Sequence, residues 1–172
     1  FKLPAGHFMT YENGQLTIEK YWEASFEPVE RPLDQIVEEI DTAVRESVQA
    51  HTNADVKVGS FLSSGVDSSY VASVLRPDKT FTVGFSAENF SEIDNAAALS
   101  KELGIENVNE VLNPKECFND FNKIQYMMDE PHSNPSIVPL YFLSRLARQH
   151  VTVVLSGEGA DELFGGYNTY QE

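Results

Sequence analysis

The chain has 172 residues, 41% of them hydrophobic and 11% aromatic, which suits one globular domain with a substantial core. Twelve Lys and Arg against 27 Asp and Glu give a formal net charge of −15, which argues against nucleic acid or an anionic membrane as a partner. No window approaches the ~18 apolar residues of a membrane span, and the single cysteine, Cys117, favours a reduced, cytoplasmic compartment.

The N-terminal part reads as a hairpin followed by a linker. An Asn-Gly pair at positions 13–14 is a strong turn signal between two strand-like runs. Pro28 and Pro32 then mark a linker. Apolar residues at helical spacing predict an amphipathic helix over residues 33–51.

Beyond residue 51 the pattern alternates between strands and helices. The predicted strands cover residues 55–62, 80–85, 107–112 and 151–155. The predicted helices cover residues 66–76, a segment from the N-cap Ser91 to Gly104, a segment from Asn113 and Pro114 with Phe118, Phe121 and Ile124 on one face, and residues 139–149. This order predicts an α/β fold with an open parallel sheet and helices on both faces.

A polar segment joins the first strand of this sheet to its helix. Residues 63–69 read SSGVDSS. Ligands of open parallel sheets bind at the carboxyl ends of the strands, and the free N–H groups of a helix N-terminus favour an anion. The hydroxyls of Ser63, Ser68 and Ser69 can add donors, and Gly65 permits close approach or a positive φ. The composition suits a phosphate cradle, although ordinary helix capping would also explain the serines.

A second glycine-rich segment, SGEGAD at residues 156–161, follows the last predicted strand. The chain lacks the lysine of a Walker A loop, the third glycine of a dinucleotide fingerprint and the G-x-S-x-G of a hydrolase elbow. The four histidines show no metal-ligand spacing. Asp67 and Asp161 could instead hold one Mg²⁺ against a pyrophosphate, or Asp67 could simply face the helix dipole.

Residues 63–69 resemble the loop of the N-type ATP pyrophosphatases, Ser-Gly-Gly-x-Asp-Ser-Ser, with Ser64 in place of the middle glycine. Together with VVLSGEGADELFGGY at residues 153–167 and DEPHSNPSIVPLYFLSRLARQHV at residues 129–151, they are similar to the glutamine-hydrolysing asparagine synthetases. The resemblance covers nearly the whole chain. It implies that residues 1–27 end a glutamine amidotransferase domain and that residues 28–172 form a truncated synthetase domain, adenine nucleotide alpha hydrolase-like in fold.

The resemblance further implies a ligase that uses the small molecules aspartate, ATP and ammonia. The aspartate side-chain carboxylate would attack the α-phosphorus of ATP, β-aspartyl-AMP would form, and Mg-pyrophosphate would leave. Ammonia from glutamine hydrolysis in another domain would then displace AMP. The resemblance leaves open whether the protein forms a homodimer.

Site residues follow from the same resemblance. The residues expected to hold pyrophosphate are Ser63, Gly65, Asp67, Ser68 and Ser69. The other nucleotide contacts are expected from Leu62 and Val83 at the adenine and from Ser156 and Gly157. Asp161 would join Asp67 on Mg²⁺, and Glu158 would be the catalytic acid–base residue or would organise formation and attack of the intermediate.

Several of these residues have a structural alternative. Leu62 and Val83 could be plain core residues, and Glu158 a solvated loop carboxylate. Glu162 is expected to face solvent or to cap a helix. The DEP sequence that begins at Asp129 could touch the site or form a turn.

The chain begins at Phe1 and ends at Glu172 directly after a glycine-rich motif, so we expect both ends to continue in the native protein. It lacks the family's catalytic cysteine and a C-terminal lysine, and by itself it is expected to bind nucleotide weakly and to make no asparagine. Ser64 would strain the loop if its position required a positive φ. Two other functions stay open: a β-lactam-forming synthetase of the same fold, and a non-catalytic nucleotide-binding domain.

Overall fold

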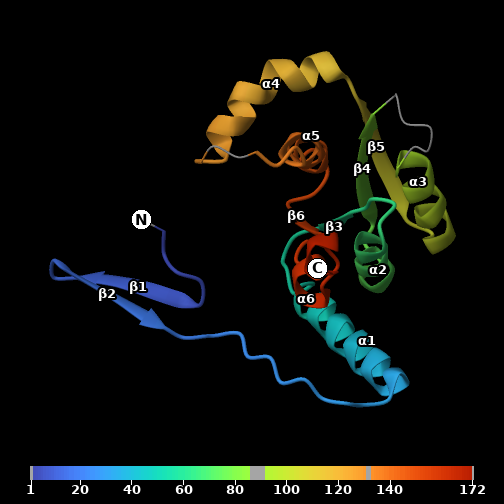
Figure 1. Cartoon of the computed structure of the whole chain (residues 1–172). Coiled ribbons are helices and arrows are strands. Elements are labelled where there is room, and N and C mark those ends of the chain that lie inside the picture. Colours follow the sequence, from blue (N-terminus) through green and yellow to red (C-terminus); the bar gives the residue numbers. More distant parts are fainter. Residues whose placement is uncertain (1, 86–91, 131–132, 172) are drawn as a thin grey trace. The chain divides into compact units, whose positions relative to one another are not determined.

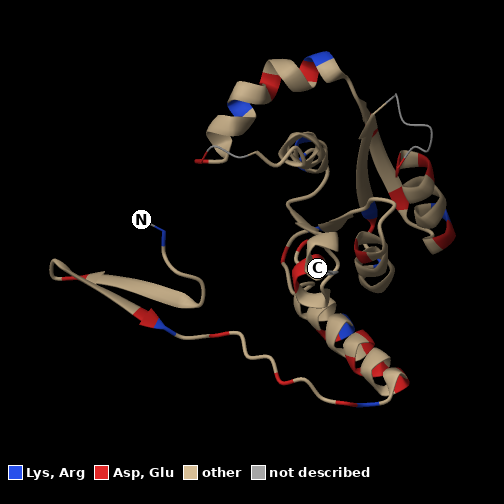
Figure 2. Cartoon of the chain, viewed as in Figure 1, with Lys and Arg blue, Asp and Glu red and all other residues tan. Residues whose placement is uncertain are grey.

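The computed structural model describes residues 2–85, 92–130 and 133–171 (Figure 1). The chain divides into two compact units, residues 1–39 and residues 40–172. Within the described ranges, no helix has the length and apolar character needed to cross a membrane. Figure 2 shows Asp and Glu spread along α1 (Leu33–Ala50) and α3 (Glu92–Leu103), in keeping with the charge of −15.

The first unit contains the predicted hairpin. Strands β1 (His7–Glu12) and β2 (Gln15–Lys20) pair antiparallel, with Glu12 opposite Gln15. Asn13 and Gly14 have φ angles of 53° and 82°, as a two-residue hairpin turn requires. The helix predicted over residues 33–51 is α1, which begins in this unit and continues into the second.

The second unit is built on the predicted parallel sheet. Its strands are β3 (Val58–Phe61), β4 (Lys79–Phe85), β5 (Glu106–Leu112) and β6 (Val153–Leu155), in the order β5-β4-β3-β6. All three pairings are parallel. The central strand β3 therefore has β4 on one side and β6 on the other, and the segments that follow β3 and β6 leave the sheet at the same edge.

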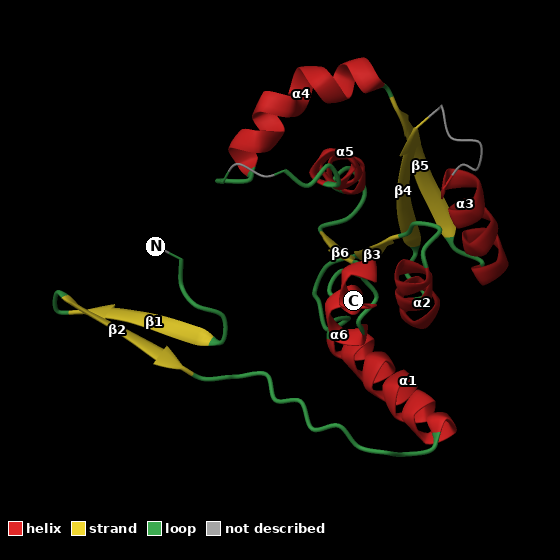
Figure 3. Cartoon of the chain, viewed as in Figure 1, coloured by secondary structure: helices red, strands yellow, loops and turns green. Residues whose placement is uncertain are grey.

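Helices cover both faces of this sheet (Figure 3). Helices α2 (Val66–Leu75) and α3 share one small core with Leu62. Helices α4 (Pro114–Met127) and α5 (Ile137–Ala147) share the larger core with Phe81 and Val83 of β4. A short helix, α6 (Ala160–Phe164), and a 3₁₀ turn, η1 (Asn168–Gln171), follow β6.

Helix α4 confirms one prediction and corrects another. Its N-cap is Asn113, whose side chain accepts a hydrogen bond from the N–H of Lys115 at 2.9 Å, as predicted. The predicted apolar face was wrong in two members, because Phe118 is 84% exposed and Phe121 is 43% exposed, whereas Ile124 is buried, as is Cys117. Successive helical residues are 100° apart, so the buried stripe runs through residue 117 rather than residue 118. The predicted cap of α3, Ser91, lies outside the described residues.

The α3 side of the sheet contains a buried polar layer. Thr80 and Thr82 alternate with the apolar residues of β4 and point toward this side. The Asn107 amide donates to both threonine hydroxyls at 3.0 Å, and Thr82 donates to the main-chain carbonyl of Leu62 at 2.8 Å. The layer therefore fixes the backbone at the point where the chain leaves β3.

We expect Phe142→Ala to lower the free energy of unfolding by about 3–5 kcal/mol, because Phe142 is fully buried in the larger core. The matched control is Phe118→Ala, which removes the same side chain from an exposed position and should change stability by less than about 0.5 kcal/mol. Urea unfolding followed by circular dichroism measures both. Equal losses in the two variants would contradict the assignment of the core.

Candidate functional site

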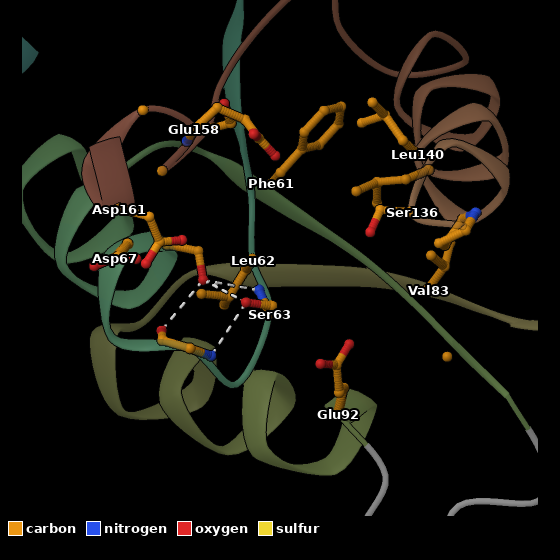
Figure 4. Close-up of a pocket in the computed structure, with 18 of the residues that line it drawn as sticks. Phe61, Leu62, Ser63, Asp67, Val83, Glu92, Ser136, Leu140, Glu158 and Asp161 are labelled. Carbon is orange, nitrogen blue, oxygen red and sulfur yellow. Dashed lines mark hydrogen bonds between the residues drawn. The ribbon is translucent and has the colours of Figure 1, made fainter. Parts of the chain in front are cut away.

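A pocket of about 390 Å³ lies at the carboxyl ends of β3, β4 and β6 (Figure 4). Both glycine-rich segments line it, together with the ends of β3 and β4 and the first residues of α3 and α5. The predicted site residues that line the pocket are Leu62, Ser63, Gly65, Asp67, Ser68, Val83, Ser156, Gly157, Glu158 and Asp161. Two segments about ninety residues apart in sequence thus meet in one place, as the phosphate-site hypothesis requires.

Ser69 is the predicted site residue that is missing from this lining. Its N–H donates to the carbonyl of Gly65 at 3.2 Å, and its own carbonyl accepts the hydroxyl of Ser73 at 2.7 Å. These are ordinary hydrogen bonds of α2, and the phosphate contact expected of Ser69 stays a prediction.

Hydroxyl groups organise the loop that follows β3. The hydroxyls of Ser63 and Ser68 lie 2.8 Å apart, and the N–H of Ser63 donates to the Ser68 oxygen at 3.1 Å. The N–H of Gly65 in turn donates to the Ser63 oxygen at 3.1 Å. The N-cap of α2 is Gly65, which has no side chain to cap the helix, so the first N–H groups of α2 remain available to an anion.

The loop carries no left-handed strain at Ser64. Among the described residues, the non-glycine positions with positive φ are Asn13, Arg76 and Asp129. Gly65 is extended, with φ −75° and ψ 155°. The strain that a serine would suffer in place of the family's glycine is therefore absent, because this position requires no positive φ.

Gly157 brings the second segment against the first. A Cβ atom at Gly157 would lie 2.9 Å from both the Cβ of Asp67 and the backbone nitrogen of Ser68. Real Cβ atoms do not approach other heavy atoms so closely. The two loops thus interlock through a contact that only glycine permits.

The two predicted metal ligands lie in the same pocket. The side chains of Asp67 and Asp161 both line it, and Figure 4 labels them on the same side of the pocket. Asp161 belongs to α6, where its carbonyl accepts the N–H of Gly166 at 3.0 Å. The Asp161 carboxylate lies so close to Gly166 that a side chain there would collide with it.

Helix α2 is anchored to α1 behind the loop. The Tyr70 hydroxyl donates to the Asp41 carboxylate, which also accepts Nε of Arg45 at 2.7 Å. The hydrogen bonds from Arg45 and then Tyr70 lower the pKa of Asp41, and the bond to Asp41 raises the pKa of Tyr70. This anchor holds the helix whose first turn carries Asp67 and Ser68.

Residues from other helices also line the pocket, outside both glycine-rich motifs. Glu92 comes from α3, Leu140 from α5, and Ser136 directly precedes α5. No motif identifies them, since their place in the site depends on how each helix packs on the sheet. Of the DEP sequence, Asp129 has a φ of 60° and is not among the described lining residues, whereas Pro131 lies outside the described residues.

Glu162 is exposed to solvent, as expected, and it also lines the pocket. One of its carboxylate oxygens accepts the Tyr167 hydroxyl at 2.8 Å, and this bond raises the pKa of Tyr167 to about 12. Tyr167 also lines the pocket and keeps its proton at neutral pH. The segment after α6 thus closes one side of the site.

The pocket is strongly acidic. Its described lining contains the carboxylates Asp67, Glu92, Glu158, Asp161 and Glu162, and neither Lys nor Arg. An anionic ligand would therefore need a cation to bind there.

The open edge of β4 offers main-chain groups to the pocket. The last residue pair between β3 and β4 is Phe61 with Phe81, and the N–H of Leu62 donates to the Phe81 carbonyl at 2.9 Å. Backbone groups of alternate residues in a strand face the same neighbour, so those of Val83 face the space beyond the end of β3. Leu62 and Val83 are 2% and 7% exposed and form an apolar wall beside these groups.

Comparison with known structures shows the fold class of the chain. An NMN synthetase from Francisella tularensis aligns with 80% of this chain and 59% of its own, with a TM-score of 0.50 and 17% identity. Such a distant similarity shows the fold alone, an open parallel α/β sheet of the predicted adenine nucleotide alpha hydrolase-like type.

Comparison of sequences then defines the family. Residues 39–172 match the family model described as asparagine synthase, so the chain belongs to the asparagine synthase family and the predicted resemblance is confirmed. Asparagine synthetase [glutamine-hydrolyzing] 1 of Bacillus subtilis is 47% identical over 98% of this chain and 27% of its own length. A putative glutamine-hydrolysing asparagine synthetase of Mycobacterium bovis is 42% identical over 99% of this chain and 28% of its own. The chain thus spans little more than a quarter of these relatives.

We expect Gly157→Ala to destabilise the second unit by about 1–3 kcal/mol, because the added methyl group must push the two loops apart. The control is Gly65→Ala, where φ is −75° and the nearest atom, the Ser63 hydroxyl oxygen, is 3.2 Å away. That variant should lose less than about 1 kcal/mol. Thermal unfolding of both variants tests the contact, and equal stability of Gly157→Ala and the unchanged chain would refute it.

Proposed function

We propose that this pocket binds ATP and that the protein containing it adenylates the side-chain carboxylate of aspartate to make asparagine. The observation that carries the proposal is the interlocked pair of glycine-rich loops at one edge of the sheet. Membership of the asparagine synthase family and the names of the relatives support the choice of this reaction.

The nucleotide would bind along the pocket, with its phosphates at α2 and its base at β4. The N-terminus of α2 and the hydroxyls of Ser63 and Ser68 supply donors for phosphate oxygens. The open N–H and C=O of Val83 match the acceptor and amine on the edge of adenine, and Leu62 offers an apolar surface to the ring. Ser156 and Gly157 would meet the ribose-phosphate from the opposite side.

Asp67 and Asp161 would hold Mg²⁺. The donor set fits, because Mg²⁺ in nucleotide sites takes one or two carboxylates and completes its shell with phosphate oxygens and water. The ion would also supply the positive charge that the described lining lacks. When bound, it would neutralise charge on the phosphates, while the loop donors fix their position.

Glu158 would act in the second half-reaction. Its carboxylate lies exposed in the pocket, and its N–H donates to the Ser156 hydroxyl at 3.4 Å. Ammonia would attack the acyl carbon of β-aspartyl-AMP, the bond to AMP would break, and Glu158 would take the proton that nitrogen loses.

The first unit would join this domain to the source of ammonia. Residues 1–27 would end a glutamine amidotransferase domain in which glutamine is hydrolysed. Supporting this, the hairpin leaves Tyr11, Leu16 and Ile18 exposed, and an isolated two-stranded hairpin is marginally stable in water. The free, buried Cys117 suits a reducing cytoplasm.

A non-catalytic nucleotide-binding domain is the weaker candidate. Its main support was Ser64, and the loop holds that residue without left-handed strain. The carboxylates of Asp67, Glu158 and Asp161 in one pocket have a use in catalysis and none in a retired site.

ATP binding should depend on Mg²⁺ through Asp161. Isothermal titration should detect binding of MgATP to the chain, and Asp161→Asn should weaken it about tenfold or more by removing a metal ligand. Asp78→Asn is the control, because it removes one charge from an exposed position outside the described pocket lining. Absence of heat both with and without Mg²⁺ would overturn the proposed site.

Glu158→Gln should separate the two half-reactions in the protein that contains this chain. Aspartate-dependent pyrophosphate release from ATP should persist, whereas asparagine formation should fall by about 10²–10⁴-fold, since Gln cannot take up a proton. Pyrophosphate release with a different carboxylate, and none with aspartate, would point to another synthetase of this fold.

A further inference from the structure

Glu92 is a pocket carboxylate to which neither motif assigns a role. It is the first residue of α3 and lines the pocket with Leu62 and Val83, far along the chain from Glu158 and Asp161. Figure 4 shows its carboxylate turned toward the pocket, on the side where Ser63 and Val83 lie. In the part of the chain that the structure describes, this carboxylate has neither a hydrogen-bond partner nor an ion-pair partner.

Such a carboxylate opposes the binding of phosphate groups. Glu92 adds negative charge to a described lining that already carries four carboxylates and neither Lys nor Arg. A carboxylate accepts hydrogen bonds and donates none, so no phosphate oxygen can satisfy it. Glu92 is exposed, so water satisfies its carboxylate in the free protein, and a bound ligand replaces that water favourably only if it presents a donor at this point.

A nucleoside triphosphate has two kinds of donor, the amine of the base and the hydroxyls of the ribose. The open backbone of Val83 already suits the amine edge of adenine. The ribose connects a base at β4 to phosphates at Ser63 and Ser68, and Glu92 contributes to the pocket between these two ends.

We propose that Glu92 accepts a hydrogen bond from the ribose 2′- or 3′-hydroxyl and makes the pocket selective for ribonucleotides. The inference rests on the proposed ATP site and adds a specificity residue to it. A charge-assisted hydrogen bond of this kind is strong enough for about tenfold discrimination between ATP and a deoxy analogue.

The test is a cycle of two proteins and four ligands. Affinities for ATP, 2′-deoxy-ATP, 3′-deoxy-ATP and ITP are measured with Mg²⁺ for the chain and for Glu92→Ala. The chain should bind ATP about tenfold more tightly than at least one deoxy analogue. Glu92→Ala should bind the two ligands with about equal affinity. The ratio is the readout, because removing a negative charge can also strengthen binding of every triphosphate.

Asp94→Ala is the matched control, since it removes an acidic side chain from the same helical turn at an exposed position outside the described lining. It should keep the preference for ribose. An unchanged preference in Glu92→Ala, or a change confined to the ratio of ATP to ITP, would overturn the assignment to ribose. Failure of the unchanged chain to bind any of the four ligands would instead overturn the proposed ATP site.

Discussion

The contact of Gly157 with the backbone at residues 67–68 is the constraint on which the site depends. It follows directly from the register of the sheet. Ser60 of β3 pairs with Leu155 of β6, so the segments that follow the two strands leave the sheet at the same level. A shift of one residue in this pairing would move Gly157 away from the loop, and a larger residue there would hold the loops apart. The arrangement of the phosphate cradle is thus set by strand pairing in the core.

The same geometry explains the acidity of the pocket. Bringing the loops together places Asp67 and Asp161 in one pocket, and like charges gathered in one pocket cost free energy unless a cation compensates them. The site is therefore poor for a free anion and suited to an anion that arrives with a divalent metal. The net charge of the chain excludes general attraction of anions, so in the proposed site recognition would rest on local N–H groups and the metal.

Local signals were enough to predict the hairpin, the alternation of strands and helices, and the loops that meet in the pocket. These features depend on turn chemistry and on apolar periods of a few residues, which a sequence displays directly. Phe118 and Phe121 were misjudged because rotation about a helix decides which neighbouring residue faces the core. Glu92 and Leu140 could not be found at all, because their place depends on how α3 and α5 lie across the sheet.

Strand β4 shows how the core and the site are connected. Phe81 and Val83 pack toward α5, whereas Thr80 and Thr82 hydrogen-bond on the side of α3. A buried hydroxyl stabilises the fold less than an apolar side chain does through burial alone. What it adds is a hydrogen bond that fixes the orientation of its partner. Thr82 binds the carbonyl of Leu62, one residue before the first serine of the cradle. A wholly apolar face would leave that carbonyl without this partner and the start of the loop less fixed. The polar layer therefore orients the loop, and the apolar face of the same strand stabilises the fold.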